Sequence, residues 1–278
     1  MIIWIASYPK SGNTWLRALI SSYYYSSDGE FNFNLLKNIE SFPQKKFFLQ
    51  YSSDFSSPTQ TTYYWIKAQK KINQESKLKF LKTHNSFCNI GGNNFTDKEN
   101  TLGCIYIVRD PRNVITSLKN HYELDYEKSL DFMINEKKYI CDSNVKNDFG
   151  NIQFLSSWKK HCSSWLENKI FPVKLVRYED LVQNTFAVFK EVVEFINNIT
   201  KNSKKLNKEK AKKTIQSSSF DNLKAKELMG EFTESVYSKK NKKKLVFFNM
   251  GPNNNWKKNV PEQLQDQINL KLKNDLYI

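Results

Sequence analysis

The chain has 278 residues, of which 39% are hydrophobic and 14% aromatic, and 43 Lys and Arg against 28 Asp and Glu give a formal net charge of +15. This composition excludes a disordered chain, and eight Gly and seven Pro exclude a collagen-like one. The apolar runs fall far short of the roughly 18 residues of a spanning helix. Because no basic segment precedes the apolar run 2–6, we expect neither membrane insertion nor a signal peptide.

Strand-like and helix-like segments alternate along the chain. Short apolar runs typical of buried strands occupy the following ranges: 2–6, 78–81, 102–108 and 173–176. Helical patterns occupy these ranges: 15–20, 61–75, 113–122, 130–141, 152–166, 186–196 and 261–274. The stretch 31–58 is irregular. This order predicts an α/β fold, a three-layer sandwich with a central parallel sheet, and one domain over residues 1–278.

The cysteines show no Cys-x-x-Cys pair and no zinc-like spacing to a histidine. They are Cys88, Cys104, Cys141 and Cys162. We therefore expect reduced thiols in a cytoplasmic protein and no metal site.

Most of the positive charge lies in residues 201–258, which contain 16 Lys, no Arg and five acidic residues. Nucleic-acid binding is one interpretation of this run, and a solvated lysine-rich surface is the other. We favour the second interpretation and expect no nucleic-acid partner.

The segment 8–14 links the first strand to the first helix. A strand-to-helix loop directs backbone N–H groups at one point, which suits a phosphate or sulfate. Lys10 adds a positive charge, and Gly12 permits close approach of the backbone. The ATP-binding pattern Gly-x-x-x-x-Gly-Lys does not fit, because Lys10 precedes Gly12.

A second anion site is predicted where the third strand ends. Arg109 stands at that end, and Ser117 follows eight residues later, two turns into the next helix. A guanidinium and a hydroxyl in this arrangement can hold a second anionic group.

Together, the segments 8–15 and 107–117 resemble the sulfotransferase family, whose members use 3'-phosphoadenosine 5'-phosphosulfate as the donor. The family's loop reads Tyr-Pro-Lys-Ser-Gly-Thr-Thr-Trp, and this chain matches seven of its eight positions. The segments 176–181 and 217–224 agree in the same order. The resemblance runs from residue 2 to about residue 258. It implies a P-loop nucleotide-binding-like fold and a cytosolic-type sulfotransferase that acts on a small-molecule acceptor without a metal.

The resemblance also implies roles for individual residues toward the donor. Those expected at the 5'-phosphosulfate are Lys10, Ser11, Gly12, Asn13 and Thr14. Those expected near the adenine are Trp15, Phe220 and Tyr178. Those expected at the 3'-phosphate are Arg109 and Ser117, and the donor-binding set also includes Ser218, Asn249, Met250 and Gly251.

The general base must be a group that can accept the proton of the acceptor. His84 follows the second strand by three residues, with Lys82 close to it. The family's Lys-Thr-His carries the base, so the resemblance implies His84 as the base and Lys82 as a stabiliser of the sulfuryl oxygens. We expect His121 to lie too far from the strand end, and His161 to lie on the surface.

Three departures from the family pattern stand out. Asn13 replaces a Thr, and Asn85-Ser86 replace a Leu-Pro pair that bears on the rim of the acceptor pocket. Asn249-Met250-Gly251 replace Arg-Lys-Gly, so an Arg expected at the 3'-phosphate is missing. Lys244 or Lys257 could substitute as point charges. We expect weaker donor affinity or a rearranged 3'-phosphate site.

Two alternatives stay open at this point: a P-loop small-molecule kinase, and a catalytically weak sulfotransferase-like nucleotide-binding protein. The sequence identifies neither the acceptor nor the oligomeric state. We expect the acceptor pocket to be lined by residues 31–64 and 85–100, with Phe48 and Phe87 among the candidates.

Overall fold

The computed structural model describes residues 1–273 apart from 76, 143–144, 233, 235 and 239–241. Within these residues, the central sheet has five strands, and every pairing is parallel. In spatial order the strands are β2 (Glu40–Ser41), β3 (Lys79–Thr83), β1 (Ile2–Ala6), β6 (Thr101–Val108) and β9 (Val173–Arg177). Parallel strands have their carboxyl ends at one edge of the sheet, which is where α/β proteins bind ligands.

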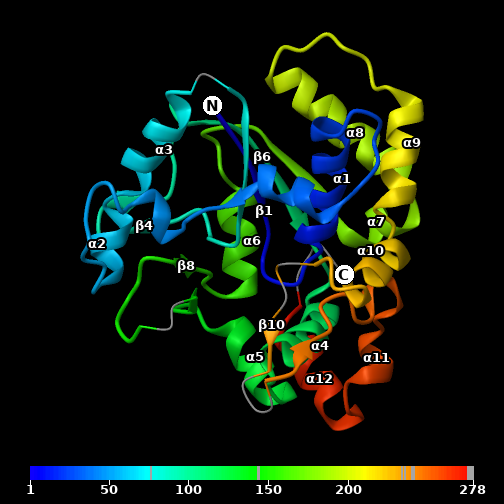
Figure 1. The fold of residues 1–278 in the computed structure, drawn as a ribbon. Helices are drawn as coiled ribbons and strands as arrows, with labels where there is room; N and C mark the ends of the chain where they lie inside the picture. The colour runs from blue at the N-terminus through cyan, green and yellow to red at the C-terminus, as the bar shows by residue number, and fades with distance from the viewer. Residues whose placement is uncertain (76, 143–144, 233, 235, 239–241, 274–278) are drawn as a thin grey trace.

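The strand β1 is the middle strand of the sheet. Its side chains are all buried. Ile2, Trp4 and Ala6 belong to the core on one face, and Ile3 and Ile5 belong to the core on the other face. Side chains alternate between the faces of a strand, so this continuous apolar run requires a helical layer on each side. Figure 1 shows these layers, with α1, α8 and α9 on one side and α3 and α6 on the other.

The helices of the described residues have the following bounds: α1 Asn13–Tyr25, α2 Pro58–Thr62, α3 Trp65–Asn73, α4 Pro111–Tyr122, α5 Tyr126–Ile134, α6 Trp158–Leu166, α7 Tyr178–Gln183, α8 Thr185–Ile199, α9 Lys208–Ser217, α10 Phe220–Leu228, α11 Trp256–Asn259 and α12 Glu262–Lys271. Short 3₁₀ turns are η1 Phe33–Asn38, η2 Lys45–Phe47 and η3 Gly251–Asn253. Small antiparallel pairs join β4 (Asn89–Ile90) to β5 (Asn93–Asn94), β7 (Tyr139–Cys141) to β8 (Ile152–Phe154), and β10 (Val236–Tyr237) to β11 (Lys244–Leu245).

The α/β fold is confirmed, and so are the four predicted strands of the central sheet. Two predicted helices are partly wrong. The range 130–141 contains the end of α5 and then β7, because the backbone becomes extended at Asn135. The range 152–166 begins with β8, and α6 starts at Trp158, where the Ser157 side chain accepts a hydrogen bond from the Lys160 N–H. The irregular stretch 31–58 includes the edge strand β2. The end of the last predicted helix, at Asn274, lies outside the described residues.

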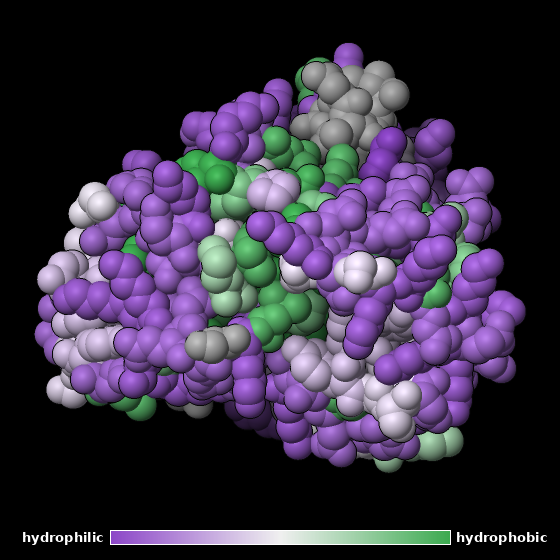
Figure 2. Space-filling view, turned by 90° about the horizontal axis from the view of Figure 1, so that it is seen from above, coloured by the Kyte–Doolittle hydropathy of each residue, from purple (hydrophilic) through white to green (hydrophobic). Residues whose placement is uncertain are grey.

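The lysines of 201–213 lie in the connection from α8 to α9 and in α9 itself. Most of them are exposed. Lys213 pairs with Asp28, and Lys212 pairs with Glu209 at 2.8 Å. Figure 2 shows that the upper face of the molecule is mainly hydrophilic, with hydrophobic residues gathered along its middle. A search of the described helices finds none that is long and apolar enough to cross a membrane. The four cysteines are free thiols.

Candidate active site

The predicted site residues meet at the carboxyl edge of the sheet. Lys10 follows β1, Lys82 lies in β3, Arg109 follows β6, and Tyr178 follows β9. These residues stand at or just after the carboxyl ends of four neighbouring strands, which lie together because the strands are parallel.

The loop after β1 is held from inside by Asn13. The Asn13 Nδ2 donates to the Ile5 carbonyl at 3.0 Å and to the Ser7 Oγ at 3.2 Å. Lys10 has φ +66° and Gly12 has φ +98°, so the chain turns twice through the left-handed region before α1 begins. The amide that replaces the family's Thr therefore fixes the loop, and Thr14 is buried in the first turn of α1.

Tyr178 brings three of the predicted donor-binding residues together. A Cβ on Gly12 would lie 2.5 Å from the Tyr178 Cδ2, so a larger residue does not fit between the loop and this ring. The Trp15 ring lies edge-on to Tyr178 at 5.8 Å, and the Arg109 guanidinium lies 4.2 Å from the Tyr178 ring centroid. Phe220 and Trp15 pack against the same hydrophobic cluster.

The two lysines of the site have lowered pKa values. Burial lowers the pKa of Lys10 to about 7, with Arg109 and Lys82 acting in the same direction and Glu227 acting against them. Burial also lowers the pKa of Lys82 to about 8, although Glu234 acts in the opposite direction. Lys10 is thus only partly charged near neutral pH, and an anionic ligand would favour the charged forms of both lysines.

The His84 side chain has a defined tautomer. Its Nδ1 lies 2.9 Å from the Ser7 carbonyl oxygen, which can only accept a hydrogen bond, so Nδ1 holds the proton. The Nε2 therefore has a free lone pair, and no described residue donates a hydrogen bond to it. Burial, together with Lys82, holds the pKa of His84 well below its usual value, so the ring is neutral. A neutral imidazole with a free Nε2 is suited to accept a proton.

His161 is buried beneath His84, so the predicted surface position is wrong. The His161 Nε2 donates to the His84 carbonyl at 3.0 Å, and the Tyr106 hydroxyl lies 2.8 Å from its Nδ1. Burial lowers the pKa of His161 to about 4. The His84 N–H donates to the Gln153 Oε1 at 2.8 Å, so both main-chain groups of His84 are fixed.

His121 also faces the site, contrary to the sequence expectation. Burial lowers its pKa to about 3, and Lys10 and Lys82 act in the same direction. Its ring lies 6.0 Å from that of Phe247, whose centroid is 3.7 Å from the Lys10 Nζ. The α4 helix runs back along the site, so a residue three turns from the strand end still reaches it.

The segment around Gly251 closes the site over Arg109. The Arg109 Nη2 donates to the Gly251 carbonyl at 2.7 Å. Gly251 has φ +48°, and a Cβ there would collide with the Phe220 ring. Gly251 therefore joins Arg109 to Phe220, two residues that are far apart in the sequence.

The remaining predicted donor-binding residues have contacts within the protein. The Ser117 Oγ accepts a hydrogen bond from the Asn254 Nδ2 at 3.4 Å. The Ser218 Oγ, which is buried, donates to the Thr214 carbonyl at 2.5 Å. Other contacts are the Asn249 carbonyl with the Lys224 Nζ at 3.3 Å, and the Met250 Sδ with the Asn259 Nδ2 at 3.6 Å.

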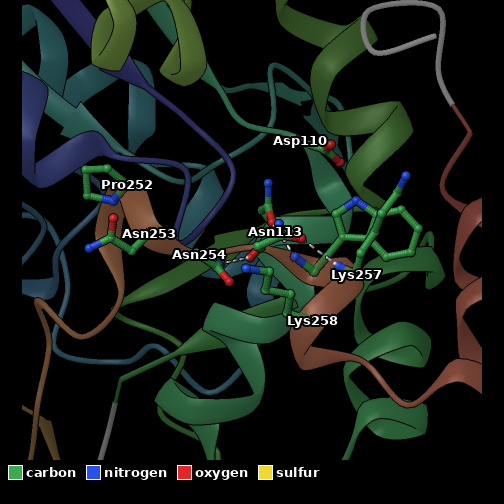
Figure 3. A pocket seen from close by; sticks show the side chains of 9 residues that line it. Asp110, Asn113, Pro252, Asn253, Asn254, Lys257 and Lys258 are labelled. Carbon is green, nitrogen blue, oxygen red and sulfur yellow. Dashed lines mark hydrogen bonds between the residues drawn. The ribbon is translucent and has the colours of Figure 1, made fainter.

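A pocket of about 670 Å³ lies beside the start of α4. Figure 3 shows Asp110 and Asn113 of this region together with Asn254, Lys257 and Lys258 of the segment before and within α11. Lys257 is thus close in space to the residue that follows Arg109. Lys244 is exposed in β11.

Two buried polar atoms at the site test whether an anionic nucleotide fits. The Ser11 Oγ and the Arg109 Nε have no hydrogen-bond partner among the described residues, although Ser11 is fully buried and Arg109 is 6% exposed. Buried polar groups are normally paired, so these two atoms fit an anionic ligand at the site. A donor with phosphate groups at the loop and near Arg109 would satisfy both. No group of three potential metal ligands occurs within the described part of the chain.

Two aromatic residues predicted at the acceptor pocket are used in packing instead. Phe48 is fully buried in the core, and Phe87 packs against Trp165 at 5.7 Å. The Tyr8 ring, which is also buried, lies 5.4 Å from that of His161 and edge-on to Phe132 at 6.5 Å.

Sequence reasoning missed an ion pair that links the site to the segment after α10. Arg17 binds Glu234 through two hydrogen bonds of 3.0 and 2.9 Å. Burial opposes ionisation of Glu234, but Arg17 and Lys82 lower its pKa to about 2. A lone Arg in the first apolar helix, in a chain with few Arg, is the signal that could have revealed it.

Comparison with known proteins agrees with this geometry. The sulfotransferase domain family matches residues 2–276. The luciferin sulfotransferase of Photinus pyralis is 24% identical over 270 residues, covering 94% of this chain and 67% of the relative. Sulfotransferase 1E1 of Bos taurus is 24% identical over 278 residues, covering 96% and 80%.

Solved structures show the same fold. Mouse sulfotransferase SULT7A1 complexed with PAP aligns with a TM-score of 0.57 and 18% identity, covering 98% of this chain and 82% of that one. Retinol dehydratase in a complex with retinol and PAP aligns with a TM-score of 0.58 and 16% identity, covering 98% and 80%. The strand-end site therefore belongs to a P-loop-like fold that binds PAP in these neighbours, and the chain is a member of the sulfotransferase family.

Proposed function

We propose that the protein transfers a sulfuryl group from 3'-phosphoadenosine 5'-phosphosulfate to a hydroxyl or amine of a small acceptor by in-line displacement. The observation that supports this most strongly is the meeting of Lys10, Lys82 and Arg109 with a neutral His84 at one edge of the sheet. The family assignment and the PAP-bound neighbours point in the same direction.

The loop after β1 and Arg109 would hold the donor. The Ser11 Oγ and the backbone N–H groups at the start of α1 are suited to the 5'-phosphate, and the Arg109 Nε to the 3'-phosphate. Trp15, Phe220 and Tyr178 supply aromatic surface for the adenine. When bound, the donor supplies the sulfuryl group and leaves as adenosine 3',5'-bisphosphate.

His84 would accept the acceptor's proton at Nε2, while the Ser7 carbonyl keeps the proton on Nδ1. Lys10 and Lys82 would stabilise the negative charge of the transferring group and of the leaving phosphate. Such catalysis depends on positioning and on electrostatic stabilisation, as in phosphoryl transfer.

A catalytically weak nucleotide-binding member of the family is the second candidate. It is favoured by one observation: the Arg109 guanidinium is bonded to the Gly251 carbonyl, and Asn249 stands where the family has an Arg. We further infer one domain over residues 1–278, and the free cysteines support a reducing, cytoplasmic location.

A thermal-shift comparison tests the donor. Adenosine 3',5'-bisphosphate should raise the Tm by several degrees, and Mg-ATP should not. Stabilisation by Mg-ATP alone would refute the proposal in favour of a kinase. A screen of phenols, alcohols, amines and sugars with labelled donor then separates an active transferase from a weak one, since the latter binds the bisphosphate without turnover.

A further inference from the structure

Glu227, at the end of α10, is a buried acidic residue that the proposed reaction does not use. Only 4% of its surface is exposed. Its Oε1 accepts a hydrogen bond from the Phe247 N–H at 2.7 Å, and its Oε2 accepts one from the Phe248 N–H at 2.8 Å. A carboxylate is costly to bury, so two charge-assisted bonds to consecutive backbone groups call for an explanation.

The two bonds fix the segment that covers the catalytic lysine. The Phe247 ring centroid lies 3.7 Å from the Lys10 Nζ, which is a cation–π distance. Phe248 is buried against Phe232 at 5.3 Å and Phe220 at 6.3 Å. Holding both N–H groups therefore fixes one ring over Lys10 and the next ring in the core.

The titratable groups around Lys10 come from four different parts of the chain. Arg109 follows β6, Lys82 lies in β3, and both oppose a charge on Lys10. His121 of α4 is neutral near physiological pH, because its pKa is lowered to about 3. Among the described residues, Glu227 is the acidic group that raises the pKa of Lys10, against burial and the two cations.

We propose that Glu227 is a positioning residue that favours the protonated form of Lys10 and aligns it beneath Phe247, ready for the anionic donor. This inference rests on the proposed function, since Lys10 matters only if an anion binds to it. Its geometric basis is the pair of bonds to the Phe247 and Phe248 N–H groups and the contact of Phe247 with Lys10.

The expected effect depends on pH in a defined direction. The donor binds the charged form of Lys10, so affinity declines as pH rises through the pKa of about 7. Glu227→Gln retains a similar shape but removes the negative charge, which moves that decline to lower pH. A displacement of one pH unit gives equal affinity at pH 5.5 and about tenfold weaker affinity at pH 8.5.

The first measurement needs no nucleotide. In protein with ¹³C-labelled lysine, the Lys10 Cε shift is titrated for the wild type, Glu227→Gln and Glu227→Asp. We expect a lower midpoint in Glu227→Gln and a midpoint near that of the wild type in Glu227→Asp. Glu231→Gln is the matched control, because Glu231 is exposed and lies 3.9 Å from Lys226. An unchanged midpoint in Glu227→Gln overturns the proposal.

The second measurement is calorimetric titration with adenosine 3',5'-bisphosphate from pH 5.5 to 8.5. A loss of affinity in Glu227→Gln that is the same at every pH would indicate a structural role only and overturn the proposal. If the wild type fails to bind the bisphosphate at all pH values, the proposed function fails, whereas the Lys10 titration still decides whether Glu227 controls its charge.

Discussion

The two sides of the site are built differently. The floor, which we define as residues 7–14, 82–84 and 109, follows directly from the ends of buried parallel strands. The cover, which we define as the described residues of α10 and 247–251, is joined to the floor by contacts such as the Gly251 carbonyl with Arg109 and the Phe247 ring over Lys10. We therefore expect the proposed chemistry to depend mainly on the floor, and donor affinity to depend on both the floor and the cover.

The largest effect is expected on the floor, at His84. In His84→Gln, loss of the free Nε2 should lower kcat by about 10²- to 10⁴-fold while the affinity for adenosine 3',5'-bisphosphate stays within a few-fold. Single-turnover assays and calorimetry measure these two quantities. His121→Asn is the comparison variant, and a loss as large as that of His84→Gln would mean that the base has been assigned to the wrong imidazole.

The pH profile tests the charges of the floor. The neutral His84, whose pKa is held well below 6.5, should give no loss of kcat/KM between pH 7 and 6. Lys10 and Lys82, with pKa values of about 7 and 8, lose their charge as pH rises, so kcat/KM for the donor should fall by about 500-fold from pH 7 to 9 if both charges are needed. A profile that rises over this range would contradict the assignment of charged lysines.

The cover should respond to Gly251→Ala with a loss of donor affinity. The new methyl group meets Phe220 at a positive φ, and backbone strain of this kind costs about 1–3 kcal/mol, so we expect roughly tenfold weaker bisphosphate binding. Gly230→Ala is a matched control, because Gly230 has φ +85° and no atom lies within 4 Å of the added Cβ. Equal losses in both variants would show that general backbone strain, not the contact with Phe220, is responsible.

The smallest effect is expected outside both regions, at Lys257. This lysine lines the pocket beside Asp110, so it acts on a bound 3'-phosphate only as a solvent-screened point charge. Lys257→Ala should weaken bisphosphate binding by about threefold at low salt and by less at high salt, as measured by calorimetry. A tenfold loss that persists at high salt would instead make Lys257 a direct substitute for the missing Arg.

The floor could be predicted from the sequence because local patterns determine it. Continuous apolar runs place Lys10 and Arg109 at strand ends, and the alternation with helices makes the strands parallel. The hairpin β7–β8 was not predictable in this way, because three-residue strands give no periodic signal. His161 illustrates a second limit: its Lys-flanked position suggests a surface, yet it is bonded to Tyr106 of β6 and to His84, which follows β3.

The cover was poorly predicted for a related reason. Glu227 stands between a Lys and a Leu in a segment whose composition is typical of an exposed, charged helix. Its partners Phe247 and Phe248 are 20 and 21 residues away in the sequence. Main-chain groups accept or donate regardless of side-chain identity, so such contacts leave no trace in the sequence.

The depressed pKa of Lys10 also makes it a nucleophile. The chain has 39 lysines, and a side-chain amine reacts with acylating reagents only when uncharged. Near pH 7 about half of Lys10 is in that form, whereas an unperturbed surface lysine is almost wholly protonated. Covalent inhibitors aimed at this site would therefore find Lys10, and to a smaller extent Lys82, more reactive than the surface lysines, and occupancy of the donor site would shield both.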